Sequence, residues 1–327
     1  MRRLGRRLRY WQRLVPAYLG RGASQLTFWH DQPGLNERAF TEVLGEYYQD
    51  FSQKADYPGP YDEAGIPVLD YRGSLGRQYN PIAIAQYGLG NHSLYRQQGD
   101  AERRARFLRA ADWLLAHLEV NPHGSQVWNH HFDWEYREGL KAPWYSALAQ
   151  GQGISLLARA YLETGAARYR DAAEAAYIPL TQEIDKGGVA YRDADSFWWL
   201  EEYLTAPPTH ILNGFLWATW GVHDHAQLTH REDVGRFFEQ LVATLTRNLP
   251  RYDTGYWSLY DLGNTRIPMV TSPFYHCLHI VQLRVMSRLT KEAGFVAMAE
   301  RWERYLRDRR KRWRGLAVKI LFKIFYY

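Results

Sequence analysis

The sequence predicts a mainly α-helical protein, an incomplete (α/α) toroid of about four helical hairpins with short β insertions at the cleft end. Four prolines recur at intervals of 62, 65 and 65 residues: Pro81, Pro143, Pro208 and Pro273. Each precedes an apolar helical stretch, a short polar break and a more charged helical stretch. Regular spacing of helix pairs is typical of repeat architectures, in which neighbouring hairpins bury one another's faces.

The inner helix of each pair should be the first one. Each first helix is the less charged of its pair, and a helix that is apolar most of the way round is buried. Proline suits the first turn of a helix, because the N–H that it lacks has no helical partner there. We therefore expect each inner helix to begin at its proline and each charged partner to lie outside.

Ahead of the first pair, the chain predicts a helix and a linker. Apolar residues recur at helical spacing over Asn36–Phe51, which predicts a lead-in helix. The stretch YPGPYDEAGIP at 57–67 holds three prolines and two glycines in eleven residues, a composition that breaks regular structure. We expect a basic arm with this helix over residues 1–66, the toroid over 67–310 and a basic amphipathic tail over 311–327.

Four strand-like stretches lie between the predicted helices. They cover residues 68–79, 127–134, 188–199 and 256–262, and each ends just before an inner helix begins. Since the inner helices of a toroid start at the same end, these insertions should rim that end and make it a cleft.

Composition narrows the classes of function. A single cysteine, Cys277, excludes an intramolecular disulfide framework and a multi-cysteine metal site. Aromatic residues make up 15% of the chain, which favours stacking on sugar rings. The sequence contains no phosphate-binding loop, dinucleotide fingerprint or G-x-S-x-G elbow, and His276 and His279 have no acidic residue nearby in sequence. We expect no cofactor and no metal.

Basic residues gather at both ends of the chain. Residues 1–14 hold six arginines and no acid, and residues 301–327 hold ten basic residues against Glu303 and Asp308. The basic, aromatic C-terminus suits peripheral contact with a membrane, although it is too short and charged to span one. No recognition fold accompanies the charge, so nucleic acid is not expected. The N-terminus has no apolar stretch typical of a signal peptide, which predicts a cytoplasmic protein, peripheral on the inner membrane where the basic ends bind it.

Candidate functional side chains cluster near the starts of the expected inner helices. They are Tyr79, Asn80, Trp144, Tyr145, Gln152, Glu201, Glu202, Tyr203, His210, Tyr260, Arg266, Tyr275, His276 and His279. Glu202 lies in the apolar stretch WWLEEYL, which favours its burial. Burial raises the pKa of a carboxyl toward neutrality and makes it a useful base, and a tyrosine can donate or accept the partner proton.

Several ordered motifs resemble one enzyme family. They are PIAIAQYGL at 81–89, WYSALAQGQGISLLARAYL at 144–162, EEY at 201–203, LNGF at 212–215, LPRYDTG at 249–255, SLYDL at 258–262 and YHCLHIVQL at 275–283. Over roughly residues 67–310 the chain resembles the C-terminal domain of the D-glucuronyl C5-epimerases, which convert glucuronate to iduronate within heparan-type chains.

The resemblance implies a uronosyl C5-epimerase that acts on a glucuronate-containing polysaccharide without a cofactor. It assigns the two acid/base groups on either side of the sugar to Glu202 and Tyr275, and it places Tyr203 and Tyr260 beside them. The family's substrate-contacting tyrosine corresponds to Tyr79. The remaining expected substrate-binding residues are Trp144, Tyr145, Gln152 and Asn213 of the LNGF motif.

One position departs from the family pattern. An arginine follows the YDL triplet in the family, whereas this chain has Gly263. We expect Arg266 to bind the substrate carboxylate instead, with His276 or His279 as alternatives. Animal members also carry β-rich domains ahead of the helical one, so their dimer does not carry over and a homodimer stays open.

Three other functions are compatible with these residues. A uronate lyase would form the same carbanion and then expel the oxygen at C4. A glycoside hydrolase would use a carboxylate pair such as Glu202 and Asp261. A glycan-binding protein would keep the aromatic site without catalysis.

Overall fold

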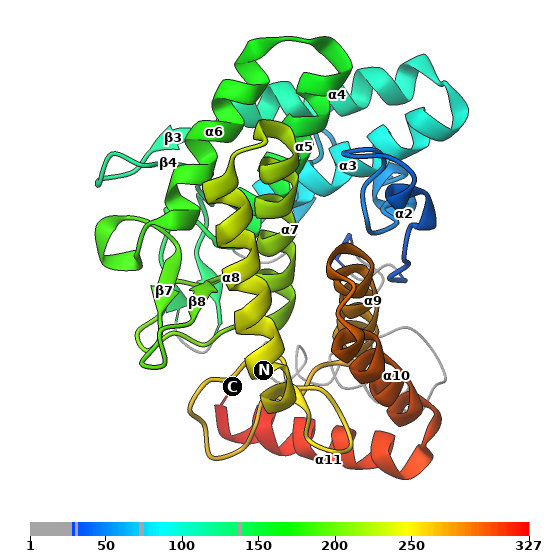
Figure 1. The fold of residues 1–327 in the computed structure, drawn as a ribbon, viewed down its shortest axis with the longest axis vertical. Coiled ribbons are helices and arrows are strands. Elements are labelled where there is room, and N and C mark those ends of the chain that lie inside the picture. Colours follow the sequence, from blue (N-terminus) through cyan, green and yellow to red (C-terminus); the bar gives the residue numbers. More distant parts are fainter. Residues whose placement is uncertain (1–27, 30–31, 72–74, 137–138, 327) are drawn as a thin grey trace. The chain divides into compact units, whose positions relative to one another are not determined.

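Helices dominate the protein (Figure 1). The computed structural model describes residues 28–29, 32–71, 75–136 and 139–326, so the basic arm expected over residues 1–14 lies outside the described residues. The α-helices are α2 (Ser52–Ala55), α3 (Pro81–Gln98), α4 (Ala101–Ala116), α5 (Ala147–Thr164), α6 (Ala167–Thr181), α7 (Leu212–Thr229), α8 (Glu232–Asn248), α9 (Pro273–Thr290), α10 (Ala293–Arg307) and α11 (Arg309–Tyr326). Short 3₁₀ helices cover Glu37–Phe40, Ile184–Lys186 and Leu249–Tyr252.

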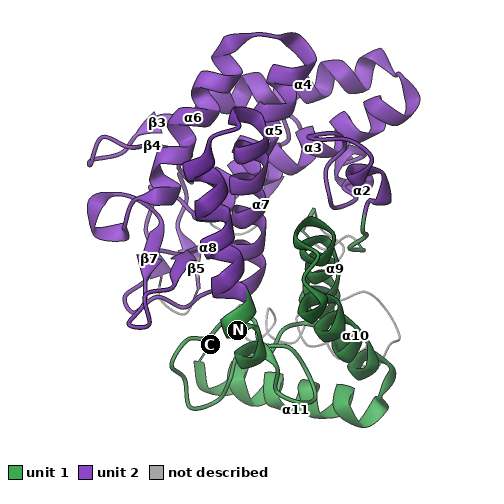
Figure 2. Cartoon of the chain, viewed as in Figure 1, with its two compact units in different colours: residues 1–35, 246–327 green, residues 36–245 purple. Residues whose placement is uncertain are grey.

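The chain divides into two compact units (Figure 2). One comprises residues 36–245 and holds α2 to α7 with nearly all of α8. The other comprises residues 1–35 and 246–327 and holds α9, α10 and α11.

The four predicted hairpins are confirmed: α3 packs on α4, α5 on α6 and α9 on α10, and the His223 ring of α7 contacts the Phe238 ring of α8. Within the 36–245 unit, α5 contacts both α3 and α7, and these three helices are buried along most of their length. Helix α4, the hairpin partner of α3, is buried along one face only. In the second turn of α5, a Cβ added at Gly151 would lie 2.5 Å from the Ala218 Cα of α7, so only glycine permits this close backbone contact.

Two of the four helix starts differ from the prediction. Pro81 and Pro273 begin α3 and α9, as expected, but Pro143 and Pro208 lie four residues before α5 and α7. After Pro143 the backbone is extended, because Trp144 exchanges two backbone hydrogen bonds with His130. Helix α5 begins only after Ser146, whose hydroxyl accepts from the Ala149 N–H at 3.1 Å.

The predicted lead-in helix over Asn36–Phe51 is wrong. The segment contains one 3₁₀ turn, and Leu44 has a φ of 52°, which an α-helix does not allow. The cause is Arg159 of α5, whose guanidinium donates to the Gly45 carbonyl at 2.8 Å and to Asp224 of α7 at 2.7 Å. The segment therefore folds around a buried cation instead of bonding to itself.

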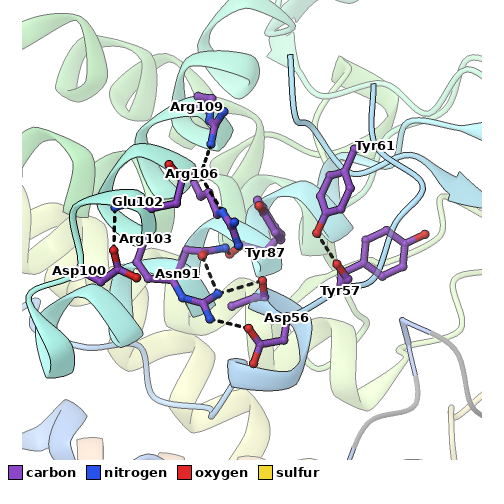
Figure 3. Close-up of polar contacts among 11 residues, drawn as sticks. Asp56, Tyr57, Tyr61, Tyr87, Asn91, Asp100, Glu102, Arg103, Arg106 and Arg109 are labelled. Carbon is purple, nitrogen blue, oxygen red and sulfur yellow. Dashed lines mark hydrogen bonds and ion pairs between the residues drawn. The ribbon is translucent and has the colours of Figure 1, made fainter. Parts of the chain in front are cut away.

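Helix α2 is tied to the first hairpin by one arginine (Figure 3). Arg103 of α4 donates to Asn91 of α3 and to the Ala55 carbonyl of α2, both at 3.2 Å. Its guanidinium also pairs with Asp56 at 2.5 Å. These bonds join the predicted outer helix α4 to the segment that precedes the first inner helix.

The insertions form antiparallel pairs of two or three residues per strand. They are β1 (Leu69–Asp70) with β2 (Arg77–Gln78), β3 (Glu119–Val120) with β4 (Gln126–Val127), β5 (Trp134–Glu135) with β6 (Gly139–Leu140), and β7 (Ala190–Arg192) with β8 (Trp198–Leu200). The fourth predicted insertion, at 256–262, contains isolated bridges in place of strands.

Candidate functional site

Glu202 follows β8 and precedes α7, in a segment whose backbone is fixed. The N–H of its neighbour Glu201 donates to the Val189 carbonyl, and the Glu201 carbonyl accepts from the N–H of Ala147, both at 2.9 Å. The Glu201 carboxylate is fully buried and bonds to the His210 ring at 2.5 Å. This carboxylate is therefore already paired, and the one beside it has different partners.

The Glu202 carboxyl is also buried, within the 36–245 unit. It is 6% exposed, and one oxygen accepts from the Asn213 amide at 3.2 Å. Burial raises the pKa of Glu202 to about 8, although hydrogen bonds from Tyr203 and Asn213 oppose the rise. A carboxyl of this kind exchanges a proton near neutral pH, as a general acid or base must.

Gly214, the next residue after Asn213, makes room for this carboxyl. A Cβ at position 214 would lie 2.4 Å from the Glu202 Oε2 atom and 2.6 Å from its Cβ atom. The first turn of α7 thus supplies both a hydrogen-bond donor and the space that the Glu202 side chain occupies.

Aromatic rings surround Tyr203. Its ring centroid lies 4.8 Å from that of Tyr136 and 5.7 Å from that of Trp144. Trp144 in turn stacks on His130 at 3.8 Å, and its indole N–H donates to the Phe132 carbonyl at 2.8 Å. Trp144 is therefore held rigidly beside Tyr203.

An open pocket of about 380 Å³ adjoins this aromatic cluster. Residues 139–141, 143–145 and 204–206 line it, including the half-buried Trp144 and Tyr145. The Tyr145 hydroxyl donates to the Gly187 carbonyl at 3.2 Å. The pocket therefore combines flat aromatic surface with the chain that directly follows Tyr203.

Tyr260 and Tyr275 meet in the other unit. Their ring centroids are 5.1 Å apart in an edge-to-face arrangement. Tyr260 is 8% exposed, and its N–H donates to the Met269 carbonyl at 2.8 Å. Tyr275 lies in the first turn of α9, where its N–H donates to the Ser272 hydroxyl at 3.4 Å. The two tyrosines that sequence reasoning selected are thus in contact.

A known protein family matches the stretch that holds these side chains. Residues 122–304, more than half of the chain, match the family described as D-glucuronyl C5-epimerase C-terminus. The chain belongs to this family. The match includes Glu202, Tyr203, Tyr260 and Tyr275.

Two curated relatives extend the comparison. The chain is 30% identical to a D-glucuronyl C5-epimerase of Caenorhabditis elegans over 222 residues, which are 62% of this chain and 35% of the relative. It is 28% identical to an uncharacterized protein of Methanocaldococcus jannaschii over 180 residues, 54% of this chain and 56% of that protein. The chain thus spans about a third to a half of the length of these relatives.

A solved structure shows the fold class. The cellobiose 2-epimerase of Spirochaeta thermophila, an (α/α)-toroid enzyme, resembles this chain with a TM-score of 0.52 at 15% identity. The likeness covers 90% of this chain and 82% of that enzyme. The predicted mainly α, toroid fold class is therefore confirmed.

In this epimerase-family chain, two histidines predicted to bind substrate lie in the core. His276 is fully buried, donates from Nε2 to the Trp302 carbonyl at 3.0 Å and accepts the Ser258 N–H at Nδ1. Burial lowers the pKa of His276 to about 3 and that of His279 well below its ordinary value. Both rings are therefore neutral at pH 7, so neither supplies a cation for a carboxylate.

Arg266, the other candidate for that role, is exposed. Its backbone N–H donates to the Tyr326 hydroxyl at 3.0 Å, and no described residue forms an ion pair with its guanidinium. Asp261 is 2% exposed and accepts from the Gly263 N–H at 3.0 Å. Binding of the substrate carboxylate by Arg266 therefore stays a prediction.

Two other predicted residues have partners of their own. Gln152 is fully buried and accepts from the Gln86 amide at 3.0 Å, between α3 and α5. Tyr79 is 41% exposed, donates its hydroxyl to Asp62 at 2.8 Å and packs against Trp113 of the outer helix α4. Neither forms a described contact with the Glu202 cluster, which consists of Glu202 and the residues around it: Tyr136, Trp144, Tyr203, Asn213 and Gly214.

Sequence reasoning did not single out two residues of the Glu202 cluster. Gly214 lies within the LNGF motif, so the sequence marks its position. The space that it leaves for Glu202 is visible only once the Glu202 side chain is placed. Tyr136 packs on Tyr203 and donates to the Thr209 hydroxyl at 3.3 Å. It lies in the polar stretch that follows β5, where no periodicity marks it. Among the described residues, no three His, Cys, Asp or Glu side chains form a group that could hold a metal ion.

Proposed function

We propose that this chain is a uronosyl C5-epimerase that converts D-glucuronate to L-iduronate residues in a polysaccharide. The observation that carries the proposal is the buried carboxyl of Glu202, with a pKa raised to about 8. The C5 proton of a uronate is only weakly acidic, so its removal needs a base stronger than an ordinary carboxylate. Membership of the epimerase family supports the same reaction.

In the proposed reaction, Glu202 and Tyr275 act on opposite faces of the sugar. The ionised Glu202 takes the C5 proton, and the electrons of the broken C–H bond move into the adjacent uronate carboxylate. Tyr275 then gives its hydroxyl proton to C5 from the other face, which forms a new C–H bond with inverted configuration. The reverse reaction uses the same groups in exchanged roles. No electrons are gained or lost, so the reaction needs no oxidant or reductant.

The intermediate needs a positive partner for its doubly charged carboxylate. Arg266 is proposed for this role, because it is exposed and forms no ion pair with a described residue. Tyr260 is proposed to orient Tyr275, since the two rings are in contact. Tyr203 is proposed to orient Glu202 through the hydrogen bond between them.

The pocket at residues 139–145 and 204–206 is proposed to hold a neighbouring sugar of the polymer. Sugar rings pack their CH faces on aromatic side chains, and Trp144 and Tyr145 are half-buried in the pocket lining. Asn213 is proposed to act on Glu202 rather than on the substrate, because its amide already donates to that carboxyl.

The decisive experiment is incubation with heparosan-type polymer in deuterated water, followed by NMR. Deuterium at C5 together with iduronate signals supports the proposal. Unsaturated ends that absorb ultraviolet light would instead identify a lyase, and new reducing ends without unsaturation a hydrolase. If several uronate polymers remain unchanged, the chain is no epimerase of such polymers and a glycan-binding role takes its place.

Two substitutions test the assigned roles. Glu202→Gln and Tyr275→Phe should each lower the exchange rate by about 10²–10⁴-fold, because each removes one acid/base group. Tyr95→Phe is the matched control: this tyrosine lies in the last turn of α3 and bonds to Glu163. Far-ultraviolet circular dichroism should be unchanged in all three. Activity retained in either site variant removes that residue from the mechanism.

A further inference from the structure

The C-terminal helix α11 is packed along one face. Leu316 and Phe322 are almost fully buried, and the Lys319 ammonium donates to the Val270 carbonyl at 2.7 Å. These residues are separated by three residues each, so they share one side of the helix. This side fixes α11 to its own unit, and the opposite side is expected to be polar, as on most surface helices.

The opposite side of α11 is instead apolar. Trp313 is 52% exposed, Leu321 47%, Ile324 65% and Phe325 69%. At 3.6 residues per turn, these four positions lie within an arc of about 120°, centred opposite the buried residues Leu316, Lys319 and Phe322. Only six other large apolar side chains are exposed among the described residues, and these are scattered over the rest of the chain. Single exposed apolar residues are ordinary, whereas a cluster on one helix marks an interaction surface.

The charge on α11 has a single sign. Residues 309–327 contain seven arginines and lysines and no acidic residue. Besides Lys319, two of the basic groups contact the unit itself: Lys311 donates to the Gly255 carbonyl at 3.0 Å, and Arg314 lies over the Tyr256 ring at 4.2 Å. Arg309 and Arg310 are exposed in the first turn. The helix therefore exposes positive charge in its first turn and apolar side chains from Trp313 to Phe325.

We propose that this face of α11 binds the surface of an anionic membrane. Lipid headgroups supply the negative charge that complements Arg309 and Arg310, and the acyl boundary accepts the exposed apolar side chains. No described helix is long and apolar enough to cross a bilayer, so α11 would lie in the interface plane. A soluble polyanion would satisfy the arginines but not the apolar residues, and for this reason a membrane is the better partner.

Co-sedimentation with vesicles tests the proposal on the full chain. Binding is compared between two kinds of vesicle, at low and at high salt. One is pure phosphatidylcholine, and the other contains about 30% phosphatidylglycerol, which supplies the anionic headgroups. The wild-type protein should bind the anionic vesicles far better, and high salt should weaken that binding. Arg309→Gln with Arg310→Gln should weaken it roughly fivefold for each arginine removed.

A matched pair of variants separates insertion from simple charge attraction. The combined variant Leu321→Ser, Ile324→Ser and Phe325→Ser should bind at least about tenfold more weakly, since each change removes apolar surface that would enter the membrane. The control variant Val43→Ser, Leu162→Ser and Ile178→Ser changes side chains that are 67%, 53% and 45% exposed on the other unit, and it should bind like the wild type.

Three outcomes would overturn the proposal. Equal binding to neutral and anionic vesicles would exclude the charge match. Full binding by the α11 serine variant would show attraction of a polyanion by the arginines alone. A dimer in sedimentation equilibrium that the same variant dissociates would identify a second copy of this chain as the occupant of the face. Circular dichroism and thermal unfolding of the serine variant confirm that α11 remains folded.

Discussion

The buried carboxyl of Glu202 makes the stability of the protein depend on pH in a predictable way. In the folded protein this carboxyl keeps its proton up to about pH 8, whereas the unfolded chain loses it near 4.5. Between these values the unfolded state binds fewer protons, so stability falls as pH rises. The free energy of unfolding should fall by about 5 kcal/mol over this pH range, since each unit of the pKa difference corresponds to about 1.4 kcal/mol. Glutamine has no proton to lose, so Glu202→Gln should remove this loss.

Thermal unfolding of wild type and Glu202→Gln from pH 4 to pH 9 measures the effect. The two unfolding temperatures should agree near pH 4, and the variant should gain on the order of 10 °C above pH 8. Glu239→Gln, at an exposed position on α8, is the control and should follow the wild type throughout. Parallel curves for wild type and Glu202→Gln across pH 4.5–8 would refute a buried, neutral Glu202.

Three further outcomes follow from the same structure. With Glu202 as base, kcat/KM for deuterium exchange should rise about tenfold per pH unit below pH 8 and then level off, and a flat profile from pH 6 to 9 would assign the base elsewhere. Gly214→Ala should reduce exchange about 10²-fold by displacing that carboxyl, whereas Gly235→Ala, which has open space around it, should not; equal rates in both variants would contradict the packing argument. Arg159→Met should destabilise the 36–245 unit by about 3–5 kcal/mol in thermal unfolding, because the buried Asp224 carboxylate loses its arginine. An unchanged unfolding temperature would show that the ion pair is dispensable.

The helical hairpins could be predicted because their signals are local. Apolar runs, polar breaks and regularly placed prolines lie within each pair, and the inner helices α3 and α5 are buried as their low charge indicated. The segment Asn36–Phe51 failed for the opposite reason. Its apolar spacing is helical, but the Gly45 carbonyl within it bonds to Arg159, more than a hundred residues away. No local pattern reports such a partner.

The candidate site shows the same division. Burial of Glu202 could be predicted from the apolar residues around it, whereas the contact between the Tyr260 and Tyr275 rings is visible only in the structure. The roles of His276 and Gln152 could not be foreseen. Both lie near the start of an inner helix, as a site residue does, but depth in the core decides whether a side chain meets ligand or neighbour.

The chain around Glu202 passes from a buried, hydrogen-bonded backbone to a pocket lining within a few residues. Glu201 is held by the Val189 carbonyl just before β7 on one side and by the start of α5 on the other, while residues 204–206 line the open pocket. Rigid support and adaptable surface therefore adjoin along a single short stretch. If this pocket holds a neighbouring sugar as proposed, changes at residues 204–206 alter which sugar it accepts while the proposed acid/base carboxyl keeps its place. Preference for one polymer over another would then be separable from the reaction itself.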